Sequence, residues 1–255
     1  MAAEQLTVIV PTLNEAANIQ PLLTRIFEQN TAALEIEVLI VDDGSTDGTC
    51  ECLLSLGQTQ PVRLLRREHP AGGLAGAVLA GAAAATSRWI LVMDADLSHP
   101  PERIGDLVAP LLDRSHDMVI GSRYVPGGRT PGWPWWRRFM SRAACLMAWP
   151  LARLHDPLSG FFATDRAWLV QCKTDAAGFK IALELIVNAQ RGFRVKEIPI
   201  VFRDRERGES KIRFGVLITY LLRLVVLLAR RMGAAFGGSR PAMLPQSHEL
   251  PKTEN

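Results

Sequence analysis

Short apolar runs alternate with amphipathic stretches along the first half of the chain. The runs LTVIV at 6–10 and IEVLIV at 36–41 are rich in β-branched residues and stop at turn-forming residues, which indicates strands. Between them, apolar residues at 19–27 recur at the three- and four-residue spacing of a helix, with Asn14 or an adjacent residue as its N-cap. The pattern predicts a strand–helix–strand unit within a buried parallel sheet.

The same alternation continues toward the C-terminus. The ranges expected to be helical are 49–56, 74–85, 100–114, 137–154 and 182–190. The ranges expected to form strands are 62–65, 89–93, 118–120 and 195–202, whereas 125–136 is typical of a long functional loop and 155–166 is expected to be irregular. The sequence therefore predicts an α/β fold with a Rossmann-like, doubly wound, mostly parallel sheet and helices on both faces.

Composition narrows the class of protein. The chain has 255 residues with a formal net charge of +3, which fits one medium-sized domain and does not indicate a nucleic-acid binder. Hydrophobic residues make up 48% and charged residues 22%, which excludes disordered and low-complexity classes. The four cysteines form no CxxC pair, and the N-terminus shows no signal peptide. We therefore expect reduced thiols and a protein on the cytoplasmic side of the membrane.

Polar side chains follow three of the expected strands. The first strand ends in PTLNE and lacks the GxGxxG pattern of dinucleotide-binding domains, which argues against an NAD or FAD enzyme. Ligands of open α/β sheets bind at the carboxyl edge of the strands, so these side chains are expected to share one site. They are Asn14 and Glu15, Asp42 and Asp43, and Asp94 and Asp96.

The pair Asp94 and Asp96 suggests a metal site. Residues two apart in an extended chain point to one side, and two close carboxylates favour a cation. Oxygen ligands without His or Cys suit Mg²⁺ or Mn²⁺, with phosphate oxygens as further ligands. A turn or capping pair before the helix is the structural alternative, and Asp42 to Ser45 fits an Asx turn equally well. The coincidence of three acidic strand ends favours the metal and nucleotide interpretation.

Eight sequence blocks, in order, resemble those of the GT-A glycosyltransferases of family 2, and within it the dolichol-phosphate or polyprenol-phosphate mannosyltransferases. The resemblance runs from about residue 6 to residue 213. An Asp-x-Asp pair alone is a weak signal, whereas the ordered set is highly specific. The blocks are VIVPTLNEAANI, VLIVDDGSTDGT, GGLAGAVLAG, ILVMDADLSHPPE, DMVIGSRY, RRFMSRAACL, DPLSGFFATDR and DRERGESK.

This resemblance implies an inverting, metal-dependent enzyme that moves mannose from GDP-mannose to the phosphate of a polyprenol, either dolichyl or undecaprenyl. By position, the donor would meet Pro11, Leu13, Glu15, Val41, Asp43, Asp94 and Ala95. The metal, Mg²⁺ or Mn²⁺, would be held by Asp94, Asp96 and Ser98. The catalytic set would be Asp96, Arg123, Arg205 and Lys211, and the acceptor phosphate would meet Arg137, Ser141 and Arg142.

Leu13 departs from the family pattern, which usually has a Tyr at this position. The change removes a stacking or hydrogen-bonding partner. Transfer of another sugar to polyprenyl phosphate, such as glucose or aminoarabinose, therefore stays open as an alternative. A non-catalytic nucleotide-sugar-binding protein is a second alternative, although the intact acidic and basic motif residues argue against it.

Basic residues between 123 and 142 fit the implied chemistry. This range holds five arginines, three tryptophans and no acid, which favours a phosphate cradle over a solvated basic loop. A phosphate monoester is already an anion near neutral pH, so the nucleophile needs no strong general base. Two phosphate groups must instead approach each other, and each unit charge pair at 4 Å repels by about 4 kcal/mol at an effective dielectric near 20.

The C-terminal part divides into three expected regions: a catalytic domain at 1–211, an amphipathic or interfacial helix at 212–235 and a disordered tail at 236–255. The apolar stretch 216–229 is shorter than the roughly 20 residues of a membrane span. We expect Arg223, Arg230 and Arg231 to meet lipid headgroups while Leu221, Leu224, Val225 and Leu228 enter the interface. A core helix is the alternative. Peripheral binding to the cytoplasmic face, with or without a membrane-anchoring subunit, follows from the first interpretation.

Overall fold

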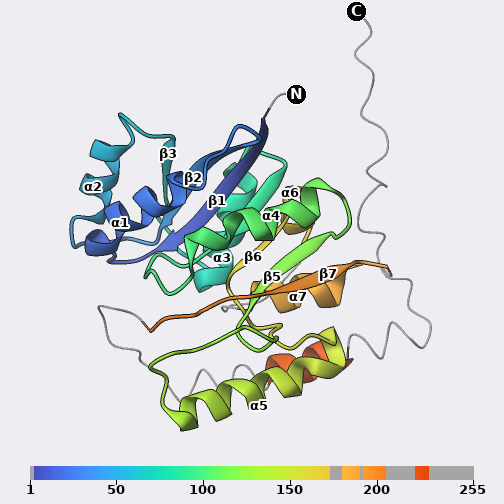
Figure 1. Ribbon diagram of the computed structural model, residues 1–255. Coiled ribbons are helices and arrows are strands. Elements are labelled where there is room, and N and C mark those ends of the chain that lie inside the picture. Colours follow the sequence, from blue (N-terminus) through green and yellow to red (C-terminus); the bar gives the residue numbers. More distant parts are fainter. Residues whose placement is uncertain (1–2, 173–179, 190–191, 205–221, 230–255) are drawn as a thin grey trace, which may run out of the picture.

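The computed structural model describes residues 3–172, 180–189, 192–204 and 222–229. A seven-stranded sheet with the order β3-β2-β1-β4-β6-β5-β7 forms its centre (Figure 1). All strand pairs are parallel except those of β6, which is antiparallel to β4 and β5. The strands are β1 (Glu4–Thr12), β2 (Leu34–Asp42), β3 (Val62–Arg66), β4 (Trp89–Val92), β5 (Met118–Ser122), β6 (Phe162–Asp165) and β7 (Val195–Pro199).

Helices cover both faces of the sheet, as predicted. They are α1 (Ala16–Phe27), α2 (Thr49–Leu56), α3 (Gly73–Ala84), α4 (Ile104–Leu112) after a 3₁₀ turn at Pro101–Arg103, α5 (Trp135–Ala152), α6 (Arg166–Val170) and α7 (Ile181–Asn188). Residues 222–229 are also helical. Among the described residues, no helix is both long enough and apolar enough to cross a bilayer.

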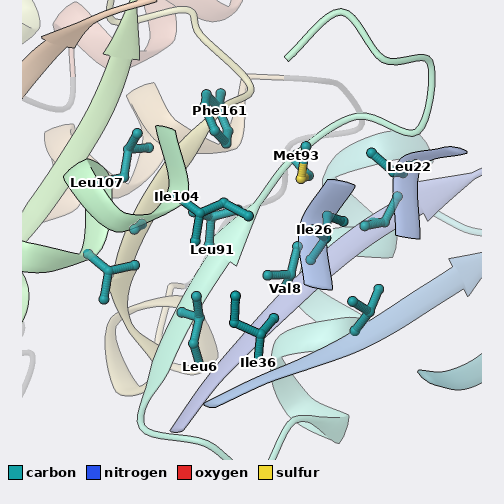
Figure 2. Close-up of a cluster of buried hydrophobic side chains, with 14 of the residues drawn as sticks. Leu6, Val8, Leu22, Ile26, Ile36, Leu91, Met93, Ile104, Leu107 and Phe161 are labelled. Carbon is teal, nitrogen blue, oxygen red and sulfur yellow. The ribbon is translucent and has the colours of Figure 1, made fainter. Parts of the chain in front are cut away.

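Alternate side chains of each strand feed two separate cores. Leu6 and Val8 of β1 face one core together with α1, α2 and α4, as Figure 2 shows for part of this cluster. Ile9, which points to the other face, packs with α3, α6 and α7. Small residues bring α3 close to the sheet, since a Cβ on Gly81 would lie 2.6 Å from the Ile9 side chain. The range 74–85, which was predicted to be helical, therefore packs closely on the sheet.

The expectation of an irregular segment at 155–166 holds for residues 155–161 and is wrong for the last five residues. Residues Phe162–Asp165 form β6, which inserts between β4 and β5 with Ala163 opposite both Leu91 and Val119. Unlike the equally short β4, which is wholly apolar, β6 contains Thr164 and Asp165 and so shows no clear apolar run, and α6 follows it without a loop. The N-cap position of α1 is Glu15, the residue adjacent to Asn14, and the Ala16 N–H donates to Asp47.

The segment 222–229 packs against α5 and α7 in a third core (Figure 1). Leu224 and Leu227 are buried there, whereas Leu222 and Val225 are exposed. Arg223 forms an ion pair with the buried Glu184 of α7, with 3.0 Å between Nη2 and Oε2. The expectation that Leu224 and Leu228 enter a lipid interface and that Arg223 meets headgroups is therefore wrong, because these side chains face the protein. Leu221, Arg230 and Arg231 lie outside the described residues.

Candidate active site

The carboxyl ends of β1 and β2 form one wall of the site. Pro11 and Val41 are buried partners in the register of these strands, while the side chain of Leu13 is 55% exposed. The loops after the two strands are tied together, because Ser45 Oγ accepts the Asn14 N–H at 2.8 Å. Glu15 precedes α1 and accepts a hydrogen bond from the Asn18 amide at 2.6 Å. Four of the residues expected around the donor therefore line one edge.

Asp42 shapes the turn after β2. Its buried carboxylate accepts the Gly44 and Ser45 N–H groups, each at 3.0 Å, and the Ser45 hydroxyl. Burial raises the pKa of Asp42, but hydrogen bonds from Ser45, Gly44 and Cys50 outweigh burial and hold this pKa below its usual range. The Asx-turn interpretation is therefore confirmed for Asp42, whereas the neighbouring Asp43 takes no part in these hydrogen bonds.

Asp43 is held by a residue that the sequence analysis missed. Arg67 donates through Nε and Nη2 to the two carboxylate oxygens, both at 2.6 Å. The same guanidinium donates to the carbonyl oxygens of Ala71 and Gly73. It thereby fixes Asp43 relative to the start of α3. A signal was present, since Arg67 follows β3 at the sheet edge that carries the other polar strand ends.

The turn after β4 presents the acidic pair. Ala95 and Asp96 are buried, while the Asp94 side chain is 32% exposed. Asp96 Oδ1 accepts the Ser98 N–H at 3.0 Å, and His99 Nδ1 accepts the Asp94 N–H at 3.0 Å. Asp96 thus has a turn-forming role as well as an acidic one, and the two interpretations of this motif are compatible.

The residues of this turn fit a hard divalent cation. Ser98 Oγ is buried and has no hydrogen-bond partner among the described residues, a cost that a metal ligand would remove. Space exists beside the acids, because Gly160 offers no side chain where a Cβ would lie 3.6 Å from Asp94 Oδ1. Among the described residues, no group of three or more His, Cys, Asp or Glu side chains could hold a metal ion. Two carboxylates and a hydroxyl suit Mg²⁺ or Mn²⁺, which complete their ligands with substrate phosphates.

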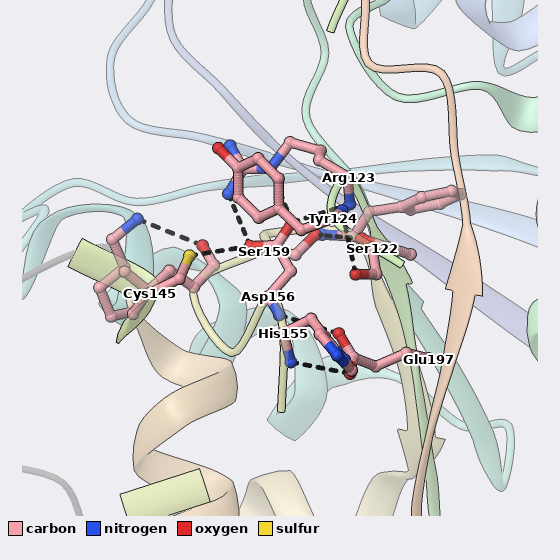
Figure 3. Close-up of polar contacts among 12 residues, drawn as sticks. Ser122, Arg123, Tyr124, Cys145, His155, Asp156, Ser159 and Glu197 are labelled. Carbon is pink, nitrogen blue, oxygen red and sulfur yellow. Dashed lines mark hydrogen bonds and ion pairs between the residues drawn. The ribbon is translucent and has the colours of Figure 1, made fainter. Parts of the chain in front are cut away.

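Arg123 forms a buried ion pair with Asp156, a second residue that the sequence analysis missed. Its Nε and Nη2 donate to the two Asp156 oxygens, both at 2.7 Å, and its backbone N–H donates at 3.0 Å (Figure 3). Burial lowers the pKa of Arg123, but Asp156 outweighs burial and holds it above the usual range. Glu197 of β7 in turn accepts the N–H groups of His155 and Asp156. The Asp156 carboxylate therefore already holds the Arg123 guanidinium before any phosphate binds.

The residues expected at the acceptor phosphate lie on α5. Arg137 and Ser141 are one turn apart, and the Arg137 guanidinium stacks 4.1 Å from the centre of the Trp133 ring. Arg142 is exposed and lies 5.4 Å from the Tyr124 ring centre. An acid does reach this cluster, because Asp204 binds Arg137 at 2.9 Å. Arg205 and Lys211 lie outside the described residues.

Comparison with known proteins places these features in a family. The sequence profile of Glycosyl transferase family 2 matches residues 7–181. A dolichol-phosphate mannosyltransferase of Saccharomyces cerevisiae is 41% identical over 239 residues, covering 89% of this chain and 88% of that protein. A protein of the same name from Pyrococcus furiosus is 37% identical over 228 residues. That match covers 88% of this chain but 64% of the Pyrococcus protein, so the chain spans less than two thirds of this relative.

Two further comparisons agree. A polyprenol monophosphomannose synthase of Mycolicibacterium smegmatis is 37% identical over 216 residues, covering 80% of both chains. The crystal structure of glucosyl-3-phosphoglycerate synthase from Mycobacterium tuberculosis with Mn²⁺, UDP-glucose and phosphoglyceric acid superposes with a TM-score of 0.68 at 22% identity, covering 90% of this chain and 80% of that one. This likeness confirms the GT-A fold. Together with the profile match and the relatives, it shows that the chain belongs to glycosyl transferase family 2.

Proposed function

We propose that this glycosyltransferase moves mannose from GDP-mannose to the phosphate of a polyprenol, with inversion at the anomeric carbon. The observation that carries the proposal is the similarity to the three relatives described above, which are named as mannosyltransferases or a monophosphomannose synthase and are 37–41% identical over 80–89% of this chain. Residues 1–211 would form the catalytic domain. The expected partners are the nucleotide-sugar donor, the lipid phosphate and the membrane surface.

The donor site would run from β1 to β4. In this proposal Pro11, Val41 and Asp43 contact the nucleoside, with Arg67 holding the Asp43 carboxylate by two hydrogen bonds of 2.6 Å. A divalent cation held by Asp94, Asp96 and Ser98 would neutralise charge on the donor pyrophosphate. The exposed Leu13 offers no hydrogen bond at the rim of this site, so the base and the sugar are selected mainly by other residues.

The acceptor site would lie at α5. A phosphate oxygen of the lipid attacks the anomeric carbon, the bond from that carbon to the donor pyrophosphate breaks, and GDP leaves on the opposite face. Arg137 and Arg142 offset the repulsion between the two phosphate groups. Trp133 holds the Arg137 guanidinium by stacking at 4.1 Å, which limits the orientations that this cation samples.

The outer face of α5 suits a membrane surface. Four large apolar side chains recur there at helical spacing and are strongly exposed: Trp135 (75%), Phe139 (68%), Leu146 (72%) and Trp149 (50%). We call these four residues the α5 stripe. Arg142 lies on the same face between Phe139 and Leu146, which places an acceptor-binding cation at headgroup depth if the stripe enters the lipid. This arrangement supports peripheral binding, for which we propose the cytoplasmic face.

A donor panel tests the proposed reaction. Purified protein with polyprenyl phosphate in detergent and Mg²⁺ or Mn²⁺ should label the lipid from GDP-mannose and not from UDP-glucose or an aminoarabinose donor. If the lipid were labelled from another donor, the protein would still be a transferase of this class, but the transferred sugar would not be mannose. Asp96→Asn should lower turnover by about 10²-fold or more, since it removes a charge that acts on the leaving group. Asp106→Asn, at an exposed acid paired with Arg103, is the matched control and should leave turnover unchanged.

A further inference from the structure

The imidazole of His99 closes the turn that carries the acidic pair. Its Nδ1 accepts the backbone N–H of Asp94 at 3.0 Å, so a side chain takes the place of a main-chain acceptor across five residues. The turn contains Leu97 in the left-handed region, with φ of 62°, which is unfavourable for a residue with a branched side chain. The bond from Asp94 to His99 therefore offsets a locally strained backbone at the metal turn.

The surroundings of the ring fix both its orientation and its protonation state. The side chain is 2% exposed, stacks on Phe161 with 5.0 Å between ring centres and meets Phe202 edge-on at 5.4 Å. Burial lowers the pKa of His99, although Asp94 and Asp96 act in the opposite direction. A backbone N–H can only donate, so Nδ1 must be the acceptor and the ring proton must sit on Nε2.

The same turn also contacts the segment that leads away from β7. The Arg203 N–H donates to the Ser98 carbonyl oxygen at 3.3 Å, next to the contact between Phe202 and His99. Gly160 lies beside both residues without a side chain, since a Cβ there would lie 3.5 Å from His99 Cε1 and 3.6 Å from Asp94 Oδ1. The ring is thus packed on three sides, and Asp94 is the group whose position it controls by hydrogen bonding.

We propose that His99 is a positioning residue for the metal site: by accepting the Asp94 N–H it holds the Asp94 and Asp96 carboxylates and the Ser98 hydroxyl in one binding arrangement. The inference rests on the proposed function only in that it requires a divalent cation at this turn. His99 touches neither the sugar nor the phosphates in this account. If His99 only filled space in the core, its volume alone would matter. If His99 positions the metal turn, it must also supply a hydrogen-bond acceptor at Nδ1.

Two substitutions separate these roles. His99→Asn places a side-chain oxygen near the position of Nδ1 and so keeps the hydrogen-bond acceptor. His99→Leu keeps much of the side-chain volume but removes the acceptor. Mn²⁺ binding in the presence of GDP is measured by the electron paramagnetic resonance signal of free Mn²⁺, with thermal unfolding of the same samples recorded in parallel. His116→Leu, at the opposite edge of the sheet before β5, is the matched control.

We expect His99→Leu to weaken Mn²⁺ binding by about 10-fold or more, the range for loss of a group that orients metal ligands. His99→Asn should stay within about threefold of the wild type, because it retains the acceptor, and His116→Leu should match the wild type. Unchanged Mn²⁺ binding in a folded His99→Leu protein would overturn the inference, as would equal losses in the Asn and Leu variants or failure of both to fold. Absence of Mn²⁺ binding in the wild type would instead overturn the metal site itself.

Discussion

At the scale of single residues, the stability of the protein depends on keeping the buried ion pair of Arg123 and Asp156 intact. The Asp156 side chain is fully buried and that of Arg123 is 11% exposed. Asp156→Asn would leave the guanidinium without its counter-charge, so we expect the free energy of unfolding to fall by about 3–5 kcal/mol, measured by urea denaturation. Glu102→Gln breaks the exposed pair with Arg25 and should cost less than about 1 kcal/mol. Similar losses in the two variants would show that Asp156 is not the partner of a buried charge.

Lys180 gives a second residue-scale prediction, on pH. Burial lowers its pKa from 10.5 to about 8, with Arg123 adding to the effect, while its Nζ donates to the Leu158 carbonyl oxygen at 3.2 Å. Between these two values the unfolded chain binds more protons than the folded one, so the contribution of Lys180 to stability rises with pH from about 8 to 10.5.

Comparison with Lys180→Met isolates this contribution. The buried thiols of Cys145 and Cys172, whose pKa values burial raises to about 12, act in the opposite direction and are present in both proteins. Relative to the variant, the wild type should gain roughly 1–3 kcal/mol of unfolding free energy between pH 7.5 and pH 10, measured by urea titration at each pH. A difference that is constant with pH would show that Lys180 ionises normally in the folded protein, and one that falls would show that folding raises its pKa.

At the scale of elements, local patterns predicted most helices and strands but not the elements that long-range contacts define. The runs that became β1, β2 and β4 are almost entirely apolar, which shows their burial, and their polar ends meet because parallel strands share a carboxyl edge. β6 has four residues, and its place between β4 and β5 follows from pairing that no local pattern encodes. The partners of Arg123 and Arg137 lie 33 and 67 positions away, so counting local charges missed Asp156 and Asp204.

The helical segment 222–229 supplies a prediction at this scale. Leu227 is 1% exposed in the core shared with α5 and α7, whereas Leu222 of the same segment is 63% exposed. Leu227→Ala should lower the free energy of unfolding by about 2–5 kcal/mol, because it leaves a cavity in that core. Leu222→Ala has the same chemistry without the cavity and should change it by less than about 0.5 kcal/mol, with urea denaturation as the measurement. Equal effects would mean that the segment does not dock as described.

At the scale of the whole molecule, the carboxyl edge of the sheet and α5 divide the proposed reaction between water and lipid. The turns proposed to bind the nucleotide follow β1, β2 and β4, while α5 lies away from α1 and α2 (Figure 1). In the proposed reaction Arg142 on the stripe face and Arg137 near Trp133 bind the lipid phosphate. A lipid phosphate can then reach the donor while its hydrocarbon chain stays in the bilayer.

This division predicts which face binds vesicles. Replacing Phe139 and Leu146 of the α5 stripe by Ser removes two side chains that would each contribute about 1.5–3 kcal/mol on full burial, so partitioning onto vesicles containing anionic lipid should fall by at least about 10-fold. The matched control is Leu54→Ser with Val170→Ser, at residues 64% and 49% exposed on α2 and α6. Co-sedimentation with the vesicles measures the binding of both double variants. Added salt should weaken binding of the wild type, because it screens the arginines of α5. Equal losses of binding in the control and stripe double variants, or no loss in the stripe double variant, would contradict membrane association through α5.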